Sequence, residues 1–260
     1  MRIFLRALAL WLATVACASA GWRVVSSERV NLPNEPVEHR LTKVENDATD
    51  DHATLHFAIF QPRNATLRII DQPVAPRRDL AEVMNEKQAL AGVNGGYFDP
   101  EDRPVGLLVS GGKKIMPLSS AHLLSGVLFA SGNRVEIVRS RRFELIGKMK
   151  EAVQCGPLLL EHGKPVAGLN HTRSARRTFA AVNETGRTAA LGYCSGVSLA
   201  DLGEILSLTN IAGESKFARA LNLDGGSSSA FWCRGADRAF SISEQKTVRD
   251  FVAILPRSDR

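Results

Sequence analysis

Short apolar segments separated by glycines and polar turns make up most of the chain after about residue 105. Each holds only a few residues, which suits a strand and is too short for a helix. The segments are Val105 to Val109, Lys114 to Met116, Gly126 to Ala130, Arg134 to Val138, Pro157 to Leu160, Ala220 to Leu223, Ser229 to Cys233 and Phe251 to Leu255. Strands this short predict a compact, mixed and mainly antiparallel sheet core.

The first part of the chain and one later pair of segments add longer strands. Between residues 21 and 71 apolar and polar residues alternate, as in Leu55–Phe60 and Thr66–Ile70. Alternation with a period of two is typical of strands with one buried face. Residues 178–182 and 188–194 read as two strands joined by the polar turn 183–186, and so predict a hairpin.

Two helices are expected. Asp79 is a suitable N-cap for a helix that runs to about Leu90, with its apolar residues mostly on one face. Ser198 is a suitable cap for a second helix, with Asp201 at its third position. With these helices beside the strands, the predicted class is α+β: one domain with a mixed, mainly antiparallel sheet core flanked by a few helices.

The N-terminus has the pattern of an export signal. Arg2 and Arg6 precede an apolar stretch that ends near Cys17, and residues 18–20 form a small-residue cleavage site. We therefore expect residues 1–20 to be a cleaved signal peptide and the mature protein to be periplasmic or secreted; Cys17 is an alternative site of lipid attachment. No later apolar run is long enough to span a membrane, so no stable span is expected after cleavage.

Charge and cysteine content restrict the possible partners. Without Arg2 and Arg6 the formal charge of +6 falls to +4, and only 6% of residues are aromatic, so a nucleic-acid partner is not expected. The mature part keeps three cysteines at spacings that do not fit a metal site: Cys155, Cys194 and Cys233. In an oxidising compartment one pair of them can form a disulfide, but the sequence does not assign which.

Three pairs of glycines follow predicted strands. Asn94 precedes Gly95 and Gly96, Asp224 precedes Gly225 and Gly226, and Gly111–Gly112 stands alone. Glycine lets a backbone approach a ligand closely, and the adjacent polar side chains would lie at the rim of a sheet. The Gly95–Gly96 and Gly225–Gly226 pairs are therefore candidates for a functional site, whereas Gly111–Gly112 is better explained as a hairpin turn.

Five stretches, in this order along the chain, resemble the phosphodiester glycosidase family. They are AGVNGGYFDP (91–100), VGLLVSGGK (105–113), QCGPLLLEHGK (154–164), RRTFAAV (176–182) and ALNLDGGSSSAFW (220–232), and VRDFVAIL (248–255) closes the similarity. The likeness spans about residues 92–255. We therefore expect a phosphodiester glycosidase-like domain over residues 51–260, continuous with a strand region at 21–50 that shows no match.

The resemblance implies hydrolysis of a sugar-1-phosphodiester at the anomeric carbon, with release of the free sugar. It places the reaction centre at Asp224, with Asp99 as the second carboxylate. Arg177 would bind the phosphate, because an arginine fork matches phosphate oxygens. The remaining residues expected to line the substrate pocket are Asn94, Gly95, Gly96, Gly156, Gly225 and Gly226. The expected substrate is an envelope or exopolysaccharide glycan.

Several alternatives remain open from the sequence. Asp99 precedes Pro100 and could simply cap a turn. Arg173 and Arg176 are better explained as a solvated strand end than as ligands. No cofactor is expected, although a divalent cation near Asp224 and Asp99 is possible. The main alternative function is a non-catalytic module in the periplasm that binds glycans or assists exopolysaccharide assembly.

Overall fold

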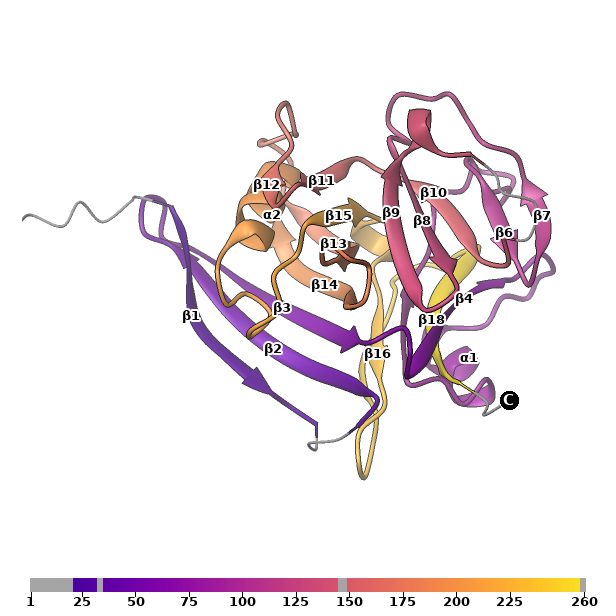
Figure 1. Ribbon diagram of the computed structural model, residues 1–260, viewed down its shortest axis with the longest axis horizontal. Coiled ribbons are helices and arrows are strands. Elements are labelled where there is room, and N and C mark those ends of the chain that lie inside the picture. Colours follow the sequence, from indigo (N-terminus) through magenta and orange to yellow (C-terminus); the bar gives the residue numbers. More distant parts are fainter. Residues whose placement is uncertain (1–20, 32–34, 145–148, 258–260) are drawn as a thin grey trace, which may run out of the picture.

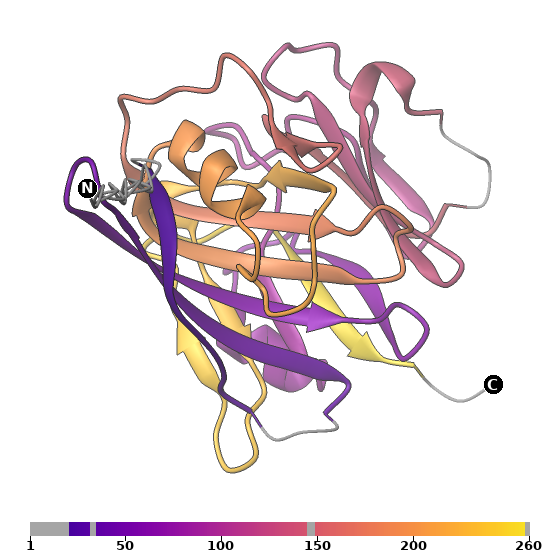
Figure 2. The same cartoon turned by 60° about the vertical axis from the view of Figure 1, so that its left-hand side comes forward.

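The computed structural model describes residues 21–31, 35–144 and 149–257, in which antiparallel strands form three sheets. The expected signal peptide and Cys17 lie outside the described residues. Figures 1 and 2 show the eight-stranded sheet and the sheet containing β6–β10 on opposite sides of the molecule. None of the described helices has the length and apolar character needed to cross a membrane.

The eight-stranded sheet has the order β1-β2-β3-β14-β13-β15-β11-β12. Its strands are β1 (Trp22–Arg29), β2 (Val37–Asn46), β3 (Asp51–Phe60), β11 (Leu158–Glu161), β12 (Lys164–Pro165), β13 (Ala175–Val182), β14 (Ala189–Val197) and β15 (Arg219–Asn222). The expected meander near the N-terminus is confirmed as β1–β3, which form one side of the sheet. The expected hairpin is confirmed as β13 and β14, which pair in antiparallel fashion.

Two five-stranded sheets complete the fold. One has the order β7-β6-β10-β8-β9, with β6 (Leu108–Ser110), β7 (Lys113–Met116), β8 (Gly126–Ser131), β9 (Arg134–Arg139) and β10 (Ala152–Cys155). The other has the order β17-β16-β5-β18-β4, with β4 (Ala65–Asp71), β5 (Ala91–Asn94), β16 (Phe231–Cys233), β17 (Phe240–Ile242) and β18 (Asp250–Pro256). Successive side chains of a strand point to opposite faces of its sheet. A central strand that is covered on both faces therefore buries all of its side chains.

Helix α1 (Leu80–Glu86) packs against the sheet of β5, where it buries Leu80, Val83 and Met84. The predicted N-cap is confirmed, because the Asp79 carboxylate accepts a hydrogen bond from the Glu82 N–H at 2.8 Å. The predicted end near Leu90 is wrong, since Gln88 has a positive φ and the chain turns there into β5.

Helix α2 (Leu199–Ser207) packs against the eight-stranded sheet. Ser198 and Asp201 form the expected cap, each side chain bonding the other's backbone N–H. The Asp201 carboxylate also accepts a hydrogen bond from the Trp22 indole at 3.0 Å, which joins α2 to β1.

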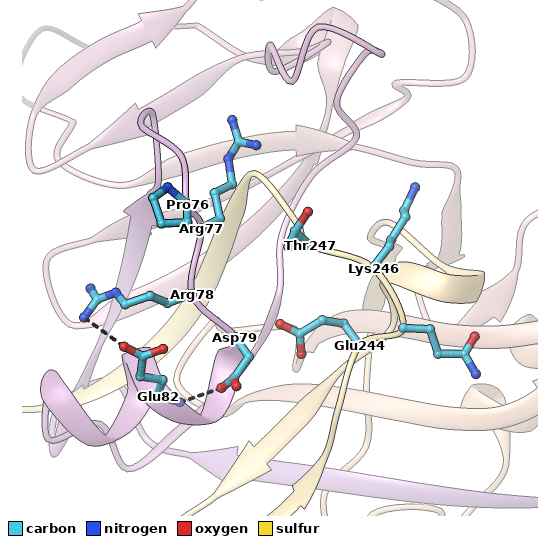
Figure 3. A pocket seen from close by; sticks show the side chains of 9 residues that line it. Pro76, Arg77, Arg78, Asp79, Glu82, Glu244, Lys246 and Thr247 are labelled. Atoms are coloured by element: carbon cyan, nitrogen blue, oxygen red, sulfur yellow. Dashed lines mark hydrogen bonds and ion pairs between the residues drawn. The ribbon is translucent and has the colours of Figure 1, made fainter.

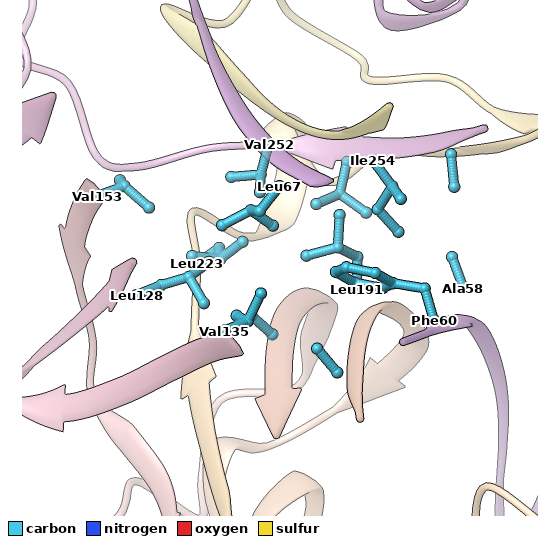
Figure 4. Close-up of a cluster of buried hydrophobic side chains, with 14 of the residues drawn as sticks. Ala58, Phe60, Leu67, Leu128, Val135, Val153, Leu191, Leu223, Val252 and Ile254 are labelled. Atoms are coloured by element: carbon cyan, nitrogen blue, oxygen red, sulfur yellow. The ribbon is translucent and has the colours of Figure 1, made fainter. Parts of the chain in front are cut away.

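The predicted α+β class needs correction, because the described part of the chain is mainly β. Besides α1 and α2 it contains only two single-turn 3₁₀ segments, η1 (Ser140–Arg142) and η2 (Gly226–Ser228). The physical reason is that the sheets bury their apolar faces on one another. Figure 4 shows this core, in which Phe60 and Leu191 of the large sheet lie near Leu67 and Ile254 of the β4–β18 pair.

A pair of buried histidines lies between the large sheet and the β16–β17 hairpin. His39 Nε2 and His56 Nδ1 are 3.1 Å apart, and Phe231 and Phe240 pack around both rings. Burial lowers the pKa of each histidine to about 4, so both are neutral at pH 7.

All three expected cysteines are buried, and each is a free thiol. The disulfide that the sequence allowed is therefore absent among Cys155, Cys194 and Cys233. Burial raises the pKa of Cys194 and of Cys233 to about 12, and it also raises the pKa of Cys155 far above its usual range. These thiols stay protonated at neutral pH, which makes them poor nucleophiles.

Candidate active site

Asn94, at the end of β5, joins two glycine loops that come from different sheets. Its side chain is fully buried; the amide nitrogen donates to the Asp224 carbonyl at 2.7 Å, and the amide oxygen accepts from Thr178 Oγ1 at 2.7 Å and the Ala230 N–H at 3.0 Å. The Asp224 N–H in turn donates to the Gly95 carbonyl at 3.0 Å. These four bonds hold the Asn94 and Asp224 loops side by side.

The loop after β15 presents Asp224 at the surface of this junction. Asp224 and the two glycines after it are partly exposed, whereas Leu223 before it is buried. The Gly225 N–H donates to Asp224 Oδ1 at 2.9 Å, and Gly226 has a φ of +64°, which a glycine adopts without strain. Burial raises the pKa of the Asp224 carboxyl, and the positive charge of Lys246 opposes that rise.

Arg177, on β13, lies on the other side of the Asp224 loop. Its Nε donates to the Val197 carbonyl at 2.9 Å and its Nη2 donates to the Arg173 carbonyl at 2.5 Å. The remaining nitrogen, Nη1, lies 3.9 Å from the position that a Cβ at Gly225 would occupy. A guanidinium held in this way is fixed beside the loop.

Gly156 supports the site from the sheet of β10. Its carbonyl accepts hydrogen bonds from the Tyr97 hydroxyl at 2.7 Å and the Asn222 side-chain amide at 2.9 Å. A Cβ at Gly156 would lie 2.0 Å from the Leu123 carbonyl oxygen, so no larger residue fits without a shift of the backbone. Gly156 is among the site residues expected from the sequence, whereas Tyr97 and Asn222, which bind its carbonyl, are not.

Asp99 has partners within its own turn. Its carboxylate accepts from the backbone N–H groups of Glu101 and Arg103 and from Arg103 Nε, at 3.0, 2.8 and 2.8 Å. The Arg103 N–H is the main reason that the pKa of Asp99 lies below its usual value. These bonds favour the turn-capping role, and none of them joins Asp99 to the Asn94–Asp224 junction.

Two other sequence interpretations are resolved by the contacts. Gly111 and Gly112 both have positive φ and connect β6 to β7 as a two-residue hairpin turn, with open space around both. Arg173 is exposed as expected, but Arg176 is not a solvated strand end. Its guanidinium donates to the carbonyls of Ser229 and Ser243, so it links β13 to the segments that contain these two serines.

A polar cavity of about 510 Å³ lies next to the Asp224 loop. Figure 3 shows residues of the segment before α1 on one side of it and the segment 244–247 on the other, with Glu244 directed between Asp79 and Thr247. The Gln245 N–H donates to the Ser227 carbonyl at 2.7 Å, which connects the wall of the cavity to the Asp224 loop. The Lys246 ammonium lies 4.9 Å from the centre of the Phe98 ring.

Asp250, at the start of β18, was missed as a site residue although it lies in a stretch that carries the family resemblance. It is 1% exposed, and its Oδ1 accepts from the Gly96 N–H at 3.1 Å. Its Oδ2 is buried without a partner among the described groups. The available signal was a charged residue that opens an otherwise apolar strand, since such residues are rarely buried without a function.

The residues that could hold a metal ion are few in this arrangement. Within the described residues, no three side chains of the histidine, cysteine, aspartate or glutamate types gather closely enough to form a metal site. The chemistry that the described groups offer is a partly buried carboxyl at Asp224 with Arg177 beside its loop, and a neighbouring polar cavity that has Lys246 on its wall.

Residues 87–255 match the sequence model of the phosphodiester glycosidase family. Among curated proteins, the uncharacterized protein YigE of Escherichia coli (strain K12) is 30% identical over 121 residues, which cover 43% of this chain. The aligned part spans only 48% of that relative, about half of its length.

Solved structures share the fold at low sequence identity. The catalytic domain of zebrafish N-acetylglucosamine-1-phosphodiester alpha-N-acetylglucosaminidase, auto-inhibited by its pro-peptide, has a TM-score of 0.66 at 14% identity, over 91% of this chain and 89% of that one. A hypothetical protein from Synechocystis has a TM-score of 0.60 at 14% identity, with 91% and 68% covered. A Burkholderia pseudomallei protein described as exported has a TM-score of 0.55 at 13% identity, with 80% and 75% covered.

Proposed function

Because the chain belongs to the phosphodiester glycosidase family and is a glycosidase-type hydrolase, we propose that it cleaves sugar-1-phosphodiesters at the anomeric carbon. Asp224 would be the catalytic carboxylate. The observation that carries the proposal is the Asn94–Asp224 junction. It places a partly buried carboxyl beside Arg177 at the meeting point of two sheets, and the hydrogen bond from Gln245 to Ser227 connects the Asp224 loop to the wall of the polar cavity.

In the proposed reaction, water adds to the anomeric carbon while the bond from that carbon to the phosphate oxygen breaks. The electron pair of that bond leaves with the phosphomonoester, and the proton of the water passes to the carboxylate or to solvent. Phosphate is a good leaving group, so the need for a general acid is smaller than in ordinary glycoside hydrolysis, but the oxocarbenium-like centre still needs a carboxylate nearby. Asp224 would stabilise that centre or activate the water.

We propose that two cations hold the phosphate. Arg177 is fixed by the carbonyls of Val197 and Arg173, so binding through its free Nη1 costs little side-chain entropy. Lys246 lies on the cavity wall, and its charge already acts on Asp224. Asn94, Gly95, Gly96, Gly225 and Gly226 would form the floor of the site and Gly156 part of its support.

Asp99 is a weaker candidate than Asp224 for a catalytic role, because its oxygens already bind its own turn. We propose that it shapes the loop that carries Tyr97 and Phe98. Asp99→Asn would then reduce activity far less than Asp224→Asn.

The test is hydrolysis of a panel of glycosyl 1-phosphodiesters, followed by release of reducing sugar. Asp224→Asn should lower kcat by at least about a hundredfold, within the range expected for loss of a catalytic group. Asp50→Asn is the matched control, because Asp50 lies at a fully exposed turn, and it should keep full activity. In ¹⁸O-labelled water the label should enter the sugar; label in the phosphate would show cleavage of the other bond and contradict the proposed reaction.

The alternative of a non-catalytic glycan-binding or assembly module predicts a different result. Such a protein would bind the glycosyl phosphodiesters tightly without releasing sugar, and Asp224→Asn would change only the affinity.

We also propose that residues 1–20 are removed on export, that residues 51–260 carry the enzymatic domain, and that the substrate is an envelope or exopolysaccharide glycan met in the periplasm or outside the cell. The export pattern at the N-terminus supports this location. Mass spectrometry of the protein from the producing cell should give a chain that starts at Gly21; an intact N-terminus in the cytoplasmic fraction would contradict the proposal.

A further inference from the structure

Asp250 lies directly beneath the turn of Gly95 and Gly96. Its backbone carbonyl accepts from the Gly95 N–H at 2.9 Å, while its carboxyl oxygen accepts from the Gly96 N–H. A Cβ at Gly95 would lie 1.8 Å from that carboxyl oxygen, so the turn and the carboxyl fit together only because residue 95 is glycine. One side chain therefore fixes the position of the turn.

The same turn holds the backbone of the proposed catalytic residue. The peptide group between Gly95 and Gly96 makes both bonds. Its carbonyl, from Gly95, accepts the Asp224 N–H, and its N–H, from Gly96, donates to Asp250 Oδ1. A shift of Asp250 would move this peptide, and with it the backbone of Asp224. The coupling passes through two hydrogen bonds and one peptide plane, which is planar and rigid.

The charges around Asp250 disfavour its ionised form. Two carboxylates face it, Asp71 on β4 and Asp224 after β15, and both raise its pKa. The neutral Cys155 thiol at the end of β10 offers no positive charge. Arg249, the neighbouring cation, already pairs with Asp71 at 2.8 Å. The buried Oδ2 also lacks a donor among the described groups. A buried carboxylate without donors costs far more than the neutral acid.

We propose that Asp250 is a positioning residue of this site, and that its protonated carboxyl holds the Gly95–Gly96 turn, and through it the backbone of Asp224, in the geometry required for catalysis. Burial raises the pKa of Asp250 to about 7, which agrees with this role. Ionisation would place a buried negative charge near Asp71 and Asp224, and this repulsion, rather than loss of the Gly96 hydrogen bond, would displace the carboxyl and the turn bound to it. The role in catalysis rests on the proposed function; the coupling of Asp250 to the turn does not.

The first experiment follows the turn without any turnover. In ¹⁵N spectra the amide signals of Gly96 and Asp224 should shift together with pH, with a midpoint near 7, and should stay fixed over that range in Asp250→Asn. Asn keeps the size of the side chain and an oxygen that accepts the Gly96 N–H, so this variant should fold. Independent behaviour of the two amides, or an unchanged midpoint in Asp250→Asn, would overturn the proposal.

The second experiment uses the pH dependence of kcat. In the wild-type protein kcat should fall above pH 7, to roughly a tenth at pH 8, because one unit above the pKa about a tenth of the groups remain protonated. Asp250→Asn should keep kcat within about threefold at pH 6 and lose the fall at pH 8. Asp250→Ala should lower kcat at least about tenfold with little change in KM, and should not be rescued by lower pH.

The matched control is Glu151→Gln. Glu151 is also a buried carboxylate, but it binds Arg68 and the Ile69 N–H away from the junction. Its replacement should lower stability and leave the pH profile of kcat unchanged. The same fall at pH 8 in Asp250→Asn, or full kcat in Asp250→Ala, would show that Asp250 has no positioning role. If no glycosyl phosphodiester is hydrolysed by the wild-type protein, the proposed function fails, and the amide titration still decides whether Asp250 controls the turn.

Discussion

Lys246, whose charge acts on the Asp224 carboxyl, is the proposed phosphate ligand that does not support the fold. It is exposed and its ammonium lies over the Phe98 ring, so the backbone does not depend on it. Arg177, in contrast, binds two backbone carbonyls and contributes to the fold as well as to the site. The two cations should therefore respond differently to substitution.

Lys246→Ala should raise KM for a glycosyl phosphodiester by about tenfold and change kcat little, because a charge-assisted hydrogen bond to phosphate contributes about 1.5 kcal/mol or more. The effect should shrink as salt is added, since the side chain is solvated. Steady-state kinetics at two salt concentrations measure both results. Lys43→Ala, an exposed lysine on β2, is the control and should behave as wild type; an unchanged KM in Lys246→Ala would remove Lys246 from the site.

At the scale of single residues, the sequence could predict those whose identity is required by the backbone. Asn94, Gly156 and Asp224 stand in short motifs, and the structure places all three within one network of hydrogen bonds. Tyr97 and Asn222 could not be selected from the sequence, and the only signal for Asp250 was that a charged residue opens an otherwise apolar strand. Their role depends on contacts between sheets, and no local pattern shows which strand end will lie beneath which turn.

At the scale of secondary structure, one carboxylate of α2 makes two different kinds of hydrogen bond. Asp201 caps the helix through Ser198 and also accepts the hydrogen bond of the Trp22 indole on β1. The first strand of the fold is thereby joined to a helix that lies far along the chain. Loss of Asp201 should therefore cost more than loss of an ordinary cap.

Ser198→Ala should reduce the free energy of unfolding by about 1 kcal/mol, the usual effect of losing an N-cap. Asp201→Ala should reduce it by about 2 to 3 kcal/mol, because the mostly buried Trp22 N–H also loses its acceptor. Urea unfolding measures both. Asp79→Ala, which removes only the cap of α1, provides the comparison; equal effects of Asp201→Ala and Ser198→Ala would show that the bond to Trp22 contributes nothing.

Elements with a clear local signal were predicted well. The alternation in residues 51–60, the polar turn at 183–186 and the cap at Ser198 each depend on neighbouring residues only. The strands β10 and β17 and the end of α1 were not predicted. β10 consists of four fully buried residues, and a short apolar segment of this kind has no period that would distinguish it from a loop or a helix.

At the scale of the whole molecule, the mainly β class follows from how the three sheets cover one another. The sequence predicted the antiparallel strands, but it could not show that sheets rather than helices would cover their apolar faces. The histidine pair lies at one of these contacts, between the large sheet and the β16–β17 hairpin. Its titration should therefore affect the stability of the whole fold.

Acidification should weaken the contact at the histidine pair. The folded-state pKa values of about 4 lie below the ordinary value of 6.5, so the unfolded chain binds more protons between these limits. Each histidine then removes at most about 1.4 kcal/mol of stability per pH unit as the pH falls from 6.5 to 4. Denaturant unfolding of wild type and of His39→Gln/His56→Gln should show a smaller loss in the variant over that range; parallel curves would contradict the assigned pKa values.

The three protonated thiols in the core determine what the chain needs to reach its native state. Since Cys155, Cys194 and Cys233 form no cross-link with one another, the fold of the described residues contains no disulfide that an oxidant or a disulfide isomerase would have to form. We therefore expect the described domain to reach the same fold under reducing and under oxidising conditions.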